Sequence, residues 1–253
     1  MKLDLKRITE ELIPVFDTAG FESINLYKKG LKIEIKNDGS PVSNGDLKVN
    51  ELICKKIKKL TPNIPIISEE TVNLKEKNKN PIFWLIDPID GTKEYISGKD
   101  EYTLNAALVI DKKPVVGLVG VPKKKQLFYS YGIGKSFVKE NNNEIKINCK
   151  KKDGRKNIVA LSNTSNPSEI IIKKLKEYRV SSISKVASSY KFCLIANGTF
   201  DIYAAICSFI NEVIIIFFCF FFWPFFFLNQ FYVYLYVFLG NPYFCLLFYI
   251  LIK

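Results

Sequence analysis

Hydrophobic and polar positions follow two different periods along the first 203 residues of this chain. Apolar residues recur at helical spacing within Met1 to Gly20 and again within Asp46 to Leu60, which predicts two amphipathic helices. Two more helices are expected at residues 168–178 and 188–196. Short runs rich in β-branched and aromatic residues predict strands. These runs are residues 31–35, 64–67, 83–86, 103–110, 114–121, 126–131, 135–138 and 158–162.

The pattern divides the chain into three parts. A run of charged residues from Lys150 to Lys156 contains an Asp-Gly pair and is the best candidate for a linker. We therefore expect an N-terminal α+β domain over residues 1–150 and the start of a C-terminal α/β domain over 151–203. Residues 204–253 form a third part of different composition.

This third part is strongly hydrophobic. It holds 19 of the chain's 35 aromatic residues and only two charges, Glu212 and Lys253. Residues 213–239 are apolar enough to cross a bilayer, although Pro224 and an Asn-Gln pair interrupt them. Phe, Tyr, Ile and Asn are also the residues that T- and A-rich DNA encodes. An aberrant tail, a membrane anchor and a genuine buried core remain open, and the aberrant tail is the favoured interpretation.

Composition narrows the possible chemistry. The chain has no histidine, which excludes Ser-His-Asp and Cys-His catalysis and histidine-bound zinc. Six scattered cysteines without a C-x-x-C pair favour a reducing compartment, and the charged N-terminus lacks the apolar core of a signal peptide. We expect a cytoplasmic protein, with membrane association through residues 213–239 as the alternative.

The formal net charge of +12 comes mostly from lysine. The lysine runs are not interleaved with aromatic residues and no nucleic-acid motif is present, so solvated lysine faces are favoured and no nucleic-acid partner is expected. A positive field would still help to gather phosphorylated substrates.

The candidate chemistry lies where the apolar run 83–86 meets Asp87-Pro88-Ile89-Asp90-Gly91-Thr92. Two carboxylates three residues apart cannot both ionise cheaply unless a cation or a hydrogen-bond network neutralises them. With Glu69 added, they suit an all-oxygen site for Mg²⁺. The alternative is a turn in which the Asp side chains cap backbone N–H groups. Asp46, which ends a polar loop, has the same alternative as a helix cap.

Four segments together resemble the inositol monophosphatase superfamily, and within it the bacterial 3'(2'),5'-bisphosphate nucleotidase branch. They are Gly39-Ser40-Pro41-Val42-Ser43 with Asp46, residues 67–70, residues 84–95 and residues 188–194. The continuation Thr92-Lys93-Glu94 and the Ser-Ser-x-Lys-Phe-Cys stretch point to the nucleotidase branch. The resemblance covers about residues 1–203 and implies an α/β fold of layered α-β-α-β-α sugar-phosphatase type.

The resemblance also implies roles for single residues. Glu69, Asp87, Asp90 and the main-chain carbonyl of Ile89 would bind Mg²⁺, with two or more ions in the site and inhibition by Li⁺. Thr92, with Glu69 or Asp46 as acidic partner, would orient and deprotonate the attacking water. The substrate would be held by Glu69, Asp90, Gly91, Thr92, Ser188 and Ser189.

The implied reaction removes the 3'-phosphate of adenosine 3',5'-bisphosphate, a small nucleotide of sulfur metabolism. The alternatives are an inositol monophosphatase and, from another class, an inactive membrane-tethered phosphate-binding protein. Family members continue into a Trp-Asp pair whose Asp completes the metal site, and this chain has no such pair after Tyr203. The chain as written therefore lacks one expected metal ligand, and the sequence leaves both its activity and its oligomeric state open.

Overall fold

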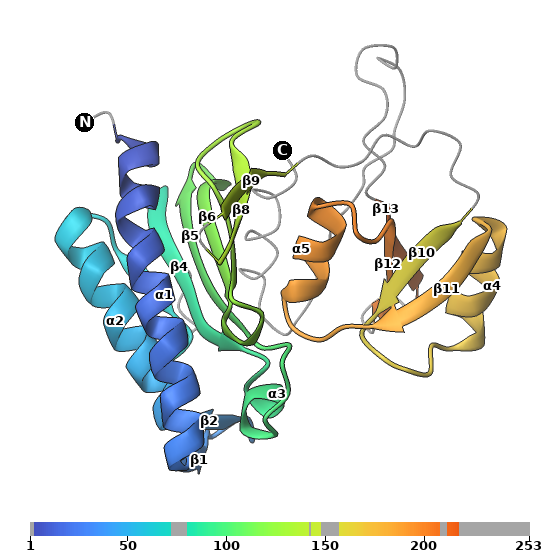
Figure 1. The fold of residues 1–253 in the computed structure, drawn as a ribbon, viewed down its shortest axis with the longest axis horizontal. Coiled ribbons are helices and arrows are strands. Elements are labelled where there is room, and N and C mark those ends of the chain that lie inside the picture. The colour runs from blue at the N-terminus through green and yellow to red at the C-terminus, as the bar shows by residue number, and fades with distance from the viewer. Residues whose placement is uncertain (1–2, 72–79, 142, 148–156, 208–211, 218–253) are drawn as a thin grey trace. The chain divides into compact units, whose positions relative to one another are not determined.

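The computed structural model describes residues 3–71, 80–141, 143–147, 157–207 and 212–217, which fall into two compact units (Figure 1). The first unit holds the described residues up to Lys146 together with Ala187–Tyr190. The second holds Ile147–Val186 and the described residues from Lys191 onward. Within the described residues, the chain leaves the first unit after Lys146, returns to it for Ala187–Tyr190 and leaves it again.

The first unit is built on a seven-stranded sheet of order β3-β4-β5-β6-β7-β8-β9. Its strands are β3 (Ile66–Ser68), β4 (Ile82–Asp90), β5 (Thr103–Ile110), β6 (Lys113–Val121), β7 (Gln126–Ser130), β8 (Ser136–Glu140) and β9 (Asn143–Lys146). β3 runs parallel to β4, and every later pair is antiparallel. The turn between β6 and β7 is a short 3₁₀ helix, η1 (Pro122–Lys124). A separate hairpin pairs β1 (Ile33–Ile35) with β2 (Pro41–Ser43).

Two long helices, α1 (Leu5–Lys29) and α2 (Asn44–Leu60), pack side by side against this sheet (Figure 1). Their apolar faces meet the sheet in one core that includes Leu12, Ile53 and Trp84, all fully buried. Burial of such side chains stabilises a fold by about 1.5–3 kcal/mol each. The third helix, α3 (Thr92–Ile96), is a single short turn after β4.

Helix α1 extends nine residues beyond the predicted end at Gly20. Gly20 lies inside the helix and faces η1, where an added Cβ would lie 3.3 Å from Pro122. The glycine therefore allows a close approach and does not end the helix. The helix ends instead at Gly30, whose φ of 93° only glycine adopts easily.

Strand β4 is longer than the predicted run 83–86, because it continues through Asp87 to Asp90. Its pairing with β5 shifts register between Asp87 and Asp90. Pro88 has no N–H to donate to the ladder, and an irregularity in the pairing accommodates it. Asp90 thus ends the strand, while Asp87 lies within it and is 2% exposed.

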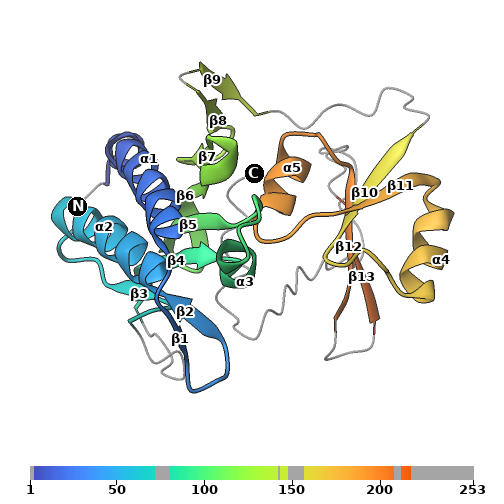
Figure 2. The same cartoon turned by 60° about the horizontal axis from the view of Figure 1, so that its bottom comes forward.

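The second unit has a four-stranded sheet of order β11-β10-β12-β13 (Figure 2). Its elements are β10 (Ile158–Ser162), α4 (Glu169–Glu177), β11 (Val180–Lys185), α5 (Tyr190–Ala196), β12 (Ile202–Cys207) and β13 (Glu212–Phe217). β10 is parallel to β11 and β12, and β12 pairs antiparallel with β13. Ile171 and Leu175 of α4 pack on Ala160 and Ile202 of the sheet.

Two predicted segments fall largely outside the described residues. The charged linker 150–156 is one of them. Of the hydrophobic tail, residues 204–207 and 212–217 lie in β12 and β13, and the remainder is not described. Within the described ranges, no helix has the length and apolar character that a bilayer crossing needs.

Candidate active site

Four acidic residues from three separate segments of the chain lie near one another in the first unit. Asp46 lies in the first turn of α2, Asp87 and Asp90 lie in β4, and Glu69 follows β3. The parallel pairing of β3 with β4 sets Ser68 opposite Ile86, and the Glu69 N–H donates to the Ile86 carbonyl at 3.2 Å. Glu69 therefore leaves the sheet edge beside Asp87.

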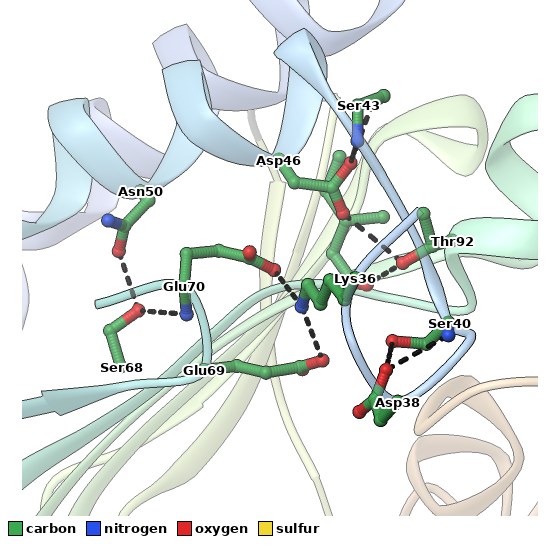
Figure 3. A network of polar contacts seen from close by, with 11 residues as sticks. Lys36, Asp38, Ser40, Ser43, Asp46, Asn50, Ser68, Glu69, Glu70 and Thr92 are labelled. Atoms are coloured by element: carbon green, nitrogen blue, oxygen red, sulfur yellow. Dashed lines mark hydrogen bonds and ion pairs between the residues drawn. The ribbon is translucent and has the colours of Figure 1, made fainter. Parts of the chain in front are cut away.

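The two carboxylate oxygens of Asp46 have separate partners (Figure 3). Oδ2 accepts from the Ser43 backbone N–H at 2.9 Å and from the Ser43 hydroxyl at 2.6 Å, which completes a capping box at the start of α2. Oδ1 accepts from the Thr92 hydroxyl at 3.2 Å. Asp46 is therefore a helix cap and, at the same time, the acidic partner of Thr92. Burial raises its pKa, although the hydrogen bonds from Ser43 and Thr92 oppose that shift.

Asp87 is the most strongly perturbed carboxyl group of the cluster. Burial, followed by repulsion from Asp90 and Glu69, raises its pKa well above the usual range. Its Oδ1 is buried and has no hydrogen-bond partner among the described residues. A buried oxygen without a partner costs about 1–3 kcal/mol, and a cation beside it would recover that cost and reverse the shift.

Lys36 lies in this cluster, and the sequence interpretation gave it no role. Its ammonium group donates to Glu70 at 2.9 Å and to Glu69 at 3.2 Å (Figure 3). Burial lowers the pKa of Lys36, but the ion pairs with Glu70 and Glu69 outweigh it and the net pKa is raised. Glu70 is the better buried partner, with its side chain 6% exposed against 37% for Glu69.

The donor set suits a hard divalent cation. Its members are carboxylates that repel one another, one of them with an unpartnered buried oxygen. No three acidic or cysteine side chains in the described parts of the chain converge as they lie on one point that could hold an ion. Lys36 holds one oxygen of Glu69, and Glu69 also acts on Asp87, so Lys36 and a cation would compete for the Glu69 carboxylate.

The turn after β4 places the Thr92 hydroxyl. Gly91 adopts φ 88°, and an added Cβ there would lie 3.4 Å from the Ser188 side chain, so both the backbone angle and the space favour glycine. The Thr92 hydroxyl is within reach of the Ile89 carbonyl at 3.1 Å as well as of Asp46. The predicted metal ligand Ile89 O and the predicted catalytic Thr92 are thus neighbours.

Ser188 and Ser189 belong to the segment that returns to the first unit. Ser189 is 2% exposed; its hydroxyl donates to Asn105 Oδ1 at 2.6 Å and accepts from the Thr103 hydroxyl at 2.6 Å. The Ser188 hydroxyl donates to the Glu101 carbonyl. These contacts fasten the segment to β5, where Asn105 is the register partner of Asp87. Their role in binding substrate stays a prediction.

Sequence reasoning missed Lys36, Glu70 and Asn105. Glu70 is next to Glu69, and Lys36 is the first residue of the polar loop that ends at Asp46. Their position beside predicted site residues is the sequence feature that could have indicated a role for them. Asn105 lies in a strand of otherwise mostly apolar residues, where a buried amide suggests a hydrogen-bond network.

Comparison with known proteins gives one consistent result. The family described as the inositol monophosphatase family matches residues 4–208. The 3'(2'),5'-bisphosphate nucleotidase CysQ of Salmonella typhimurium is 33% identical over 199 residues, covering 77% of this chain and 78% of its own. The crystal structure of CysQ from Bacteroides thetaiotaomicron has a TM-score of 0.62 at 26% identity, covering 79% of each chain. An IMPase/NADP phosphatase complexed with Mg²⁺ and phosphate has a TM-score of 0.65 at 18% identity, covering 80% and 76%.

Proposed function

This chain belongs to the inositol monophosphatase family and is by that relationship a phosphatase, and we propose that it removes the 3'-phosphate of adenosine 3',5'-bisphosphate with Mg²⁺ as cofactor. The observation that carries the proposal is the buried Asp87 carboxyl, repelled by Asp90 and Glu69, close to a threonine hydroxyl that is hydrogen-bonded to Asp46.

Glu69, Asp87, Asp90 and the carbonyl of Ile89 are the groups that would hold the cation. A divalent ion there supplies positive charge that favours ionised Asp87 and a lowered pKa for bound water. The excess of carboxylates makes the cation a requirement, because these groups would otherwise repel an approaching phosphate.

Thr92 and Asp46 account for the water's proton. The Thr92 hydroxyl donates to Asp46 Oδ1, which leaves its oxygen lone pairs available to accept a hydrogen bond from a water. As the water gives its proton to Thr92 Oγ, the Thr92 hydroxyl gives its own proton to Asp46 Oδ1. Burial raises the pKa of Asp46 toward the pH at which the enzyme would work, and a carboxylate with a higher pKa is a better base. The water oxygen then bonds to phosphorus as the bond from phosphorus to the ester oxygen breaks, and the leaving oxygen takes up a proton from solvent water.

The preference for a nucleotide rests on three supports. Lys93 and Glu94 follow Thr92 in the pattern of the nucleotidase branch, and the Ser188-Ser189 segment is fastened next to Gly91. The third support is the nucleotidase relative. We expect kcat/KM for adenosine 3',5'-bisphosphate to exceed that for inositol 1-phosphate.

The test measures phosphate release from both substrates by the full chain, with Mg²⁺ and after exhaustive chelation. Asp90→Asn, which exchanges a charged ligand for a neutral one, should abolish release and spare the circular dichroism spectrum. Release that survives chelation would sink the metal assignment, and an equal or reversed substrate ratio would move the chain to the inositol branch. Li⁺ should inhibit whichever activity is found.

A further inference from the structure

The first unit contains a hollow of about 360 Å³ that none of the residues proposed above lines. Helix α1, the turn η1 with its flanking strands β6 and β7, and strand β8 enclose it. Phe16 and Leu127 are buried and form part of its apolar wall, whereas Phe21 keeps 63% of its surface exposed. A hollow of this size with an exposed aromatic ring suits a small planar ligand.

Gln126 presents an unused acceptor at this hollow. Its Nε2 donates to Glu140 Oε1 at 3.2 Å across the β7–β8 pair, and its Oε1 is buried without a hydrogen-bond partner among the described residues. A carboxylate only accepts hydrogen bonds, so the amide cannot be reversed without setting its oxygen against Glu140. The Oε1 atom is therefore fixed as an acceptor. It is covered as the side chain lies, so an N–H group of a ligand in the hollow would reach it after a small shift of the Gln126 side chain.

The charge around the hollow is positive. Lys123, Lys125 and Lys139 line it against the single acid Asp17, which is paired with Lys139 at 2.6 Å. Lys123 stands over the ring of Tyr27 at 5.1 Å, and Lys125 is exposed. Lys125 also holds φ at 53°, a left-handed angle that costs a residue with a side chain about 1 kcal/mol. Neither the Lys123 nor the Lys125 ammonium group has an acidic partner among the described residues, so both can meet an anion, Lys123 from beside the Tyr27 ring.

We propose that this hollow is a binding site for a nucleoside monophosphate, separate from the carboxylate cluster. The base stacks on Phe21, an N–H of the base donates to Gln126 Oε1, and Lys123 and Lys125 bind the phosphate. Each of the three parts of such a ligand has its own partner on the protein. An acidic peptide would pair with the lysines, but it offers no specific partner for the Phe21 ring or for Gln126 Oε1.

The primary experiment measures binding of adenosine 5'-monophosphate to the full chain by calorimetry, with a chelator present to suppress binding at the carboxylates. Lys125→Gln should weaken binding about tenfold, the effect of losing one charge-assisted contact. The matched control is Lys124→Gln, because Lys124 lies in the same turn, does not line the hollow and pairs with Asp100 at 3.6 Å. It should change binding by less than about twofold.

A second pair of measurements separates the base from the phosphate. Phe21→Ala, at an exposed position, should weaken adenosine 5'-monophosphate at least fivefold and leave ribose 5-phosphate unchanged, because only the first has a ring to stack. Asp90→Asn should leave both unchanged under chelation.

Four results would overturn the proposal. They are the absence of saturable binding, equal losses in the Lys124 and Lys125 variants, loss of binding in Asp90→Asn, and self-association of the chain that Phe21→Ala abolishes. The second result would show a general positive field, the third would place the nucleotide at the carboxylate cluster, and the last would show that a second copy covers this face.

Discussion

Asp46→Asn separates the two functions that the structure gives to one side chain. The amide keeps one acceptor oxygen, and two donors from Ser43 compete for it against one from Thr92. The oxygen should face Ser43 and leave the amide nitrogen toward Thr92. The cap then survives in weakened form, while Thr92 loses the group that would take its proton.

The two effects differ in size. Replacing an ionised acceptor by a neutral one at the cap should lower the free energy of unfolding by about 1 kcal/mol. Loss of a positioned base should lower kcat by about 10²–10⁴, which corresponds to about 2.7–5.5 kcal/mol in the activation barrier. The change in kcat should therefore greatly exceed what the change in stability explains.

Ser43→Ala is the matched control. It removes the hydroxyl that donates to Asp46 and that accepts from Gly45 N–H at 3.1 Å, so α2 loses its cap while Asp46 keeps its contact with Thr92. It should cost about 0.5–2 kcal/mol of stability and change kcat by less than about threefold. The assays are urea unfolding and kcat at saturating substrate and Mg²⁺. If both variants lose similar stability and neither loses activity, Asp46 is only a helix cap and the proton path is refuted.

Three more outcomes follow from the structure. Lys36→Met leaves Glu70 and Glu69 without their cation, so it should lower the urea midpoint under chelation, and the difference from the wild-type midpoint should narrow as Mg²⁺ is added. Lys48→Met breaks only an exposed pair with Glu51 and should show neither effect. A difference in midpoint that does not depend on Mg²⁺ would contradict the competition for Glu69. Burial raises the pKa of Tyr102 to about 12, so the stability that its neutral hydroxyl contributes is complete below about pH 10 and is lost as pH rises toward 12. The urea midpoints of the wild type and Tyr102→Phe should therefore converge between about pH 10 and about pH 12. Midpoints that stay parallel over this range would refute the shift. Replacing residues 204–253 by the C-terminal segment of an active family member, Trp-Asp pair included, should restore solubility and Mg²⁺-dependent activity together, whereas a native chain that is active in membranes would make the tail an evolved anchor.

The elements that sequence predicted well carry their own signal. The fold class is confirmed, and the helix at Asp46 and the strands at 103–110 and 126–131 agree with the structure within two residues. Each combines a clear hydrophobic period with a cap or a turn at its ends. The strands that were missed are β2, β9, β11, β12 and β13. The first three are short or mostly exposed, so neither burial nor alternation marks them. β12 spans residue 203 and β13 lies beyond it, where the change in composition led to the prediction of a separate tail.

Long-range contacts explain the remaining differences. The residues around Gly20 do not indicate that Pro122 packs against it, and those around Lys36 do not indicate its ion pair with Glu70. The motif from Asp87 to Thr92 was visible because its members are adjacent, whereas Glu69 and Asp46, which act on Asp87 and Thr92, come from other elements. Thr103 and Asn105 meet Ser189 only after more than eighty residues of intervening chain.

The return of Ala187–Tyr190 to the first unit has a consequence for synthesis on the ribosome. At about 5–20 residues per second, the roughly forty residues between Lys146 and this segment take about 2–8 seconds to be made. During that interval Thr103 and Asn105 lack the Ser189 hydroxyl, and the Gly91 turn lacks the Ser188 side chain beside it. The contacts that this segment makes with β5 and with the Gly91 turn can therefore form only after translation has passed residue 190.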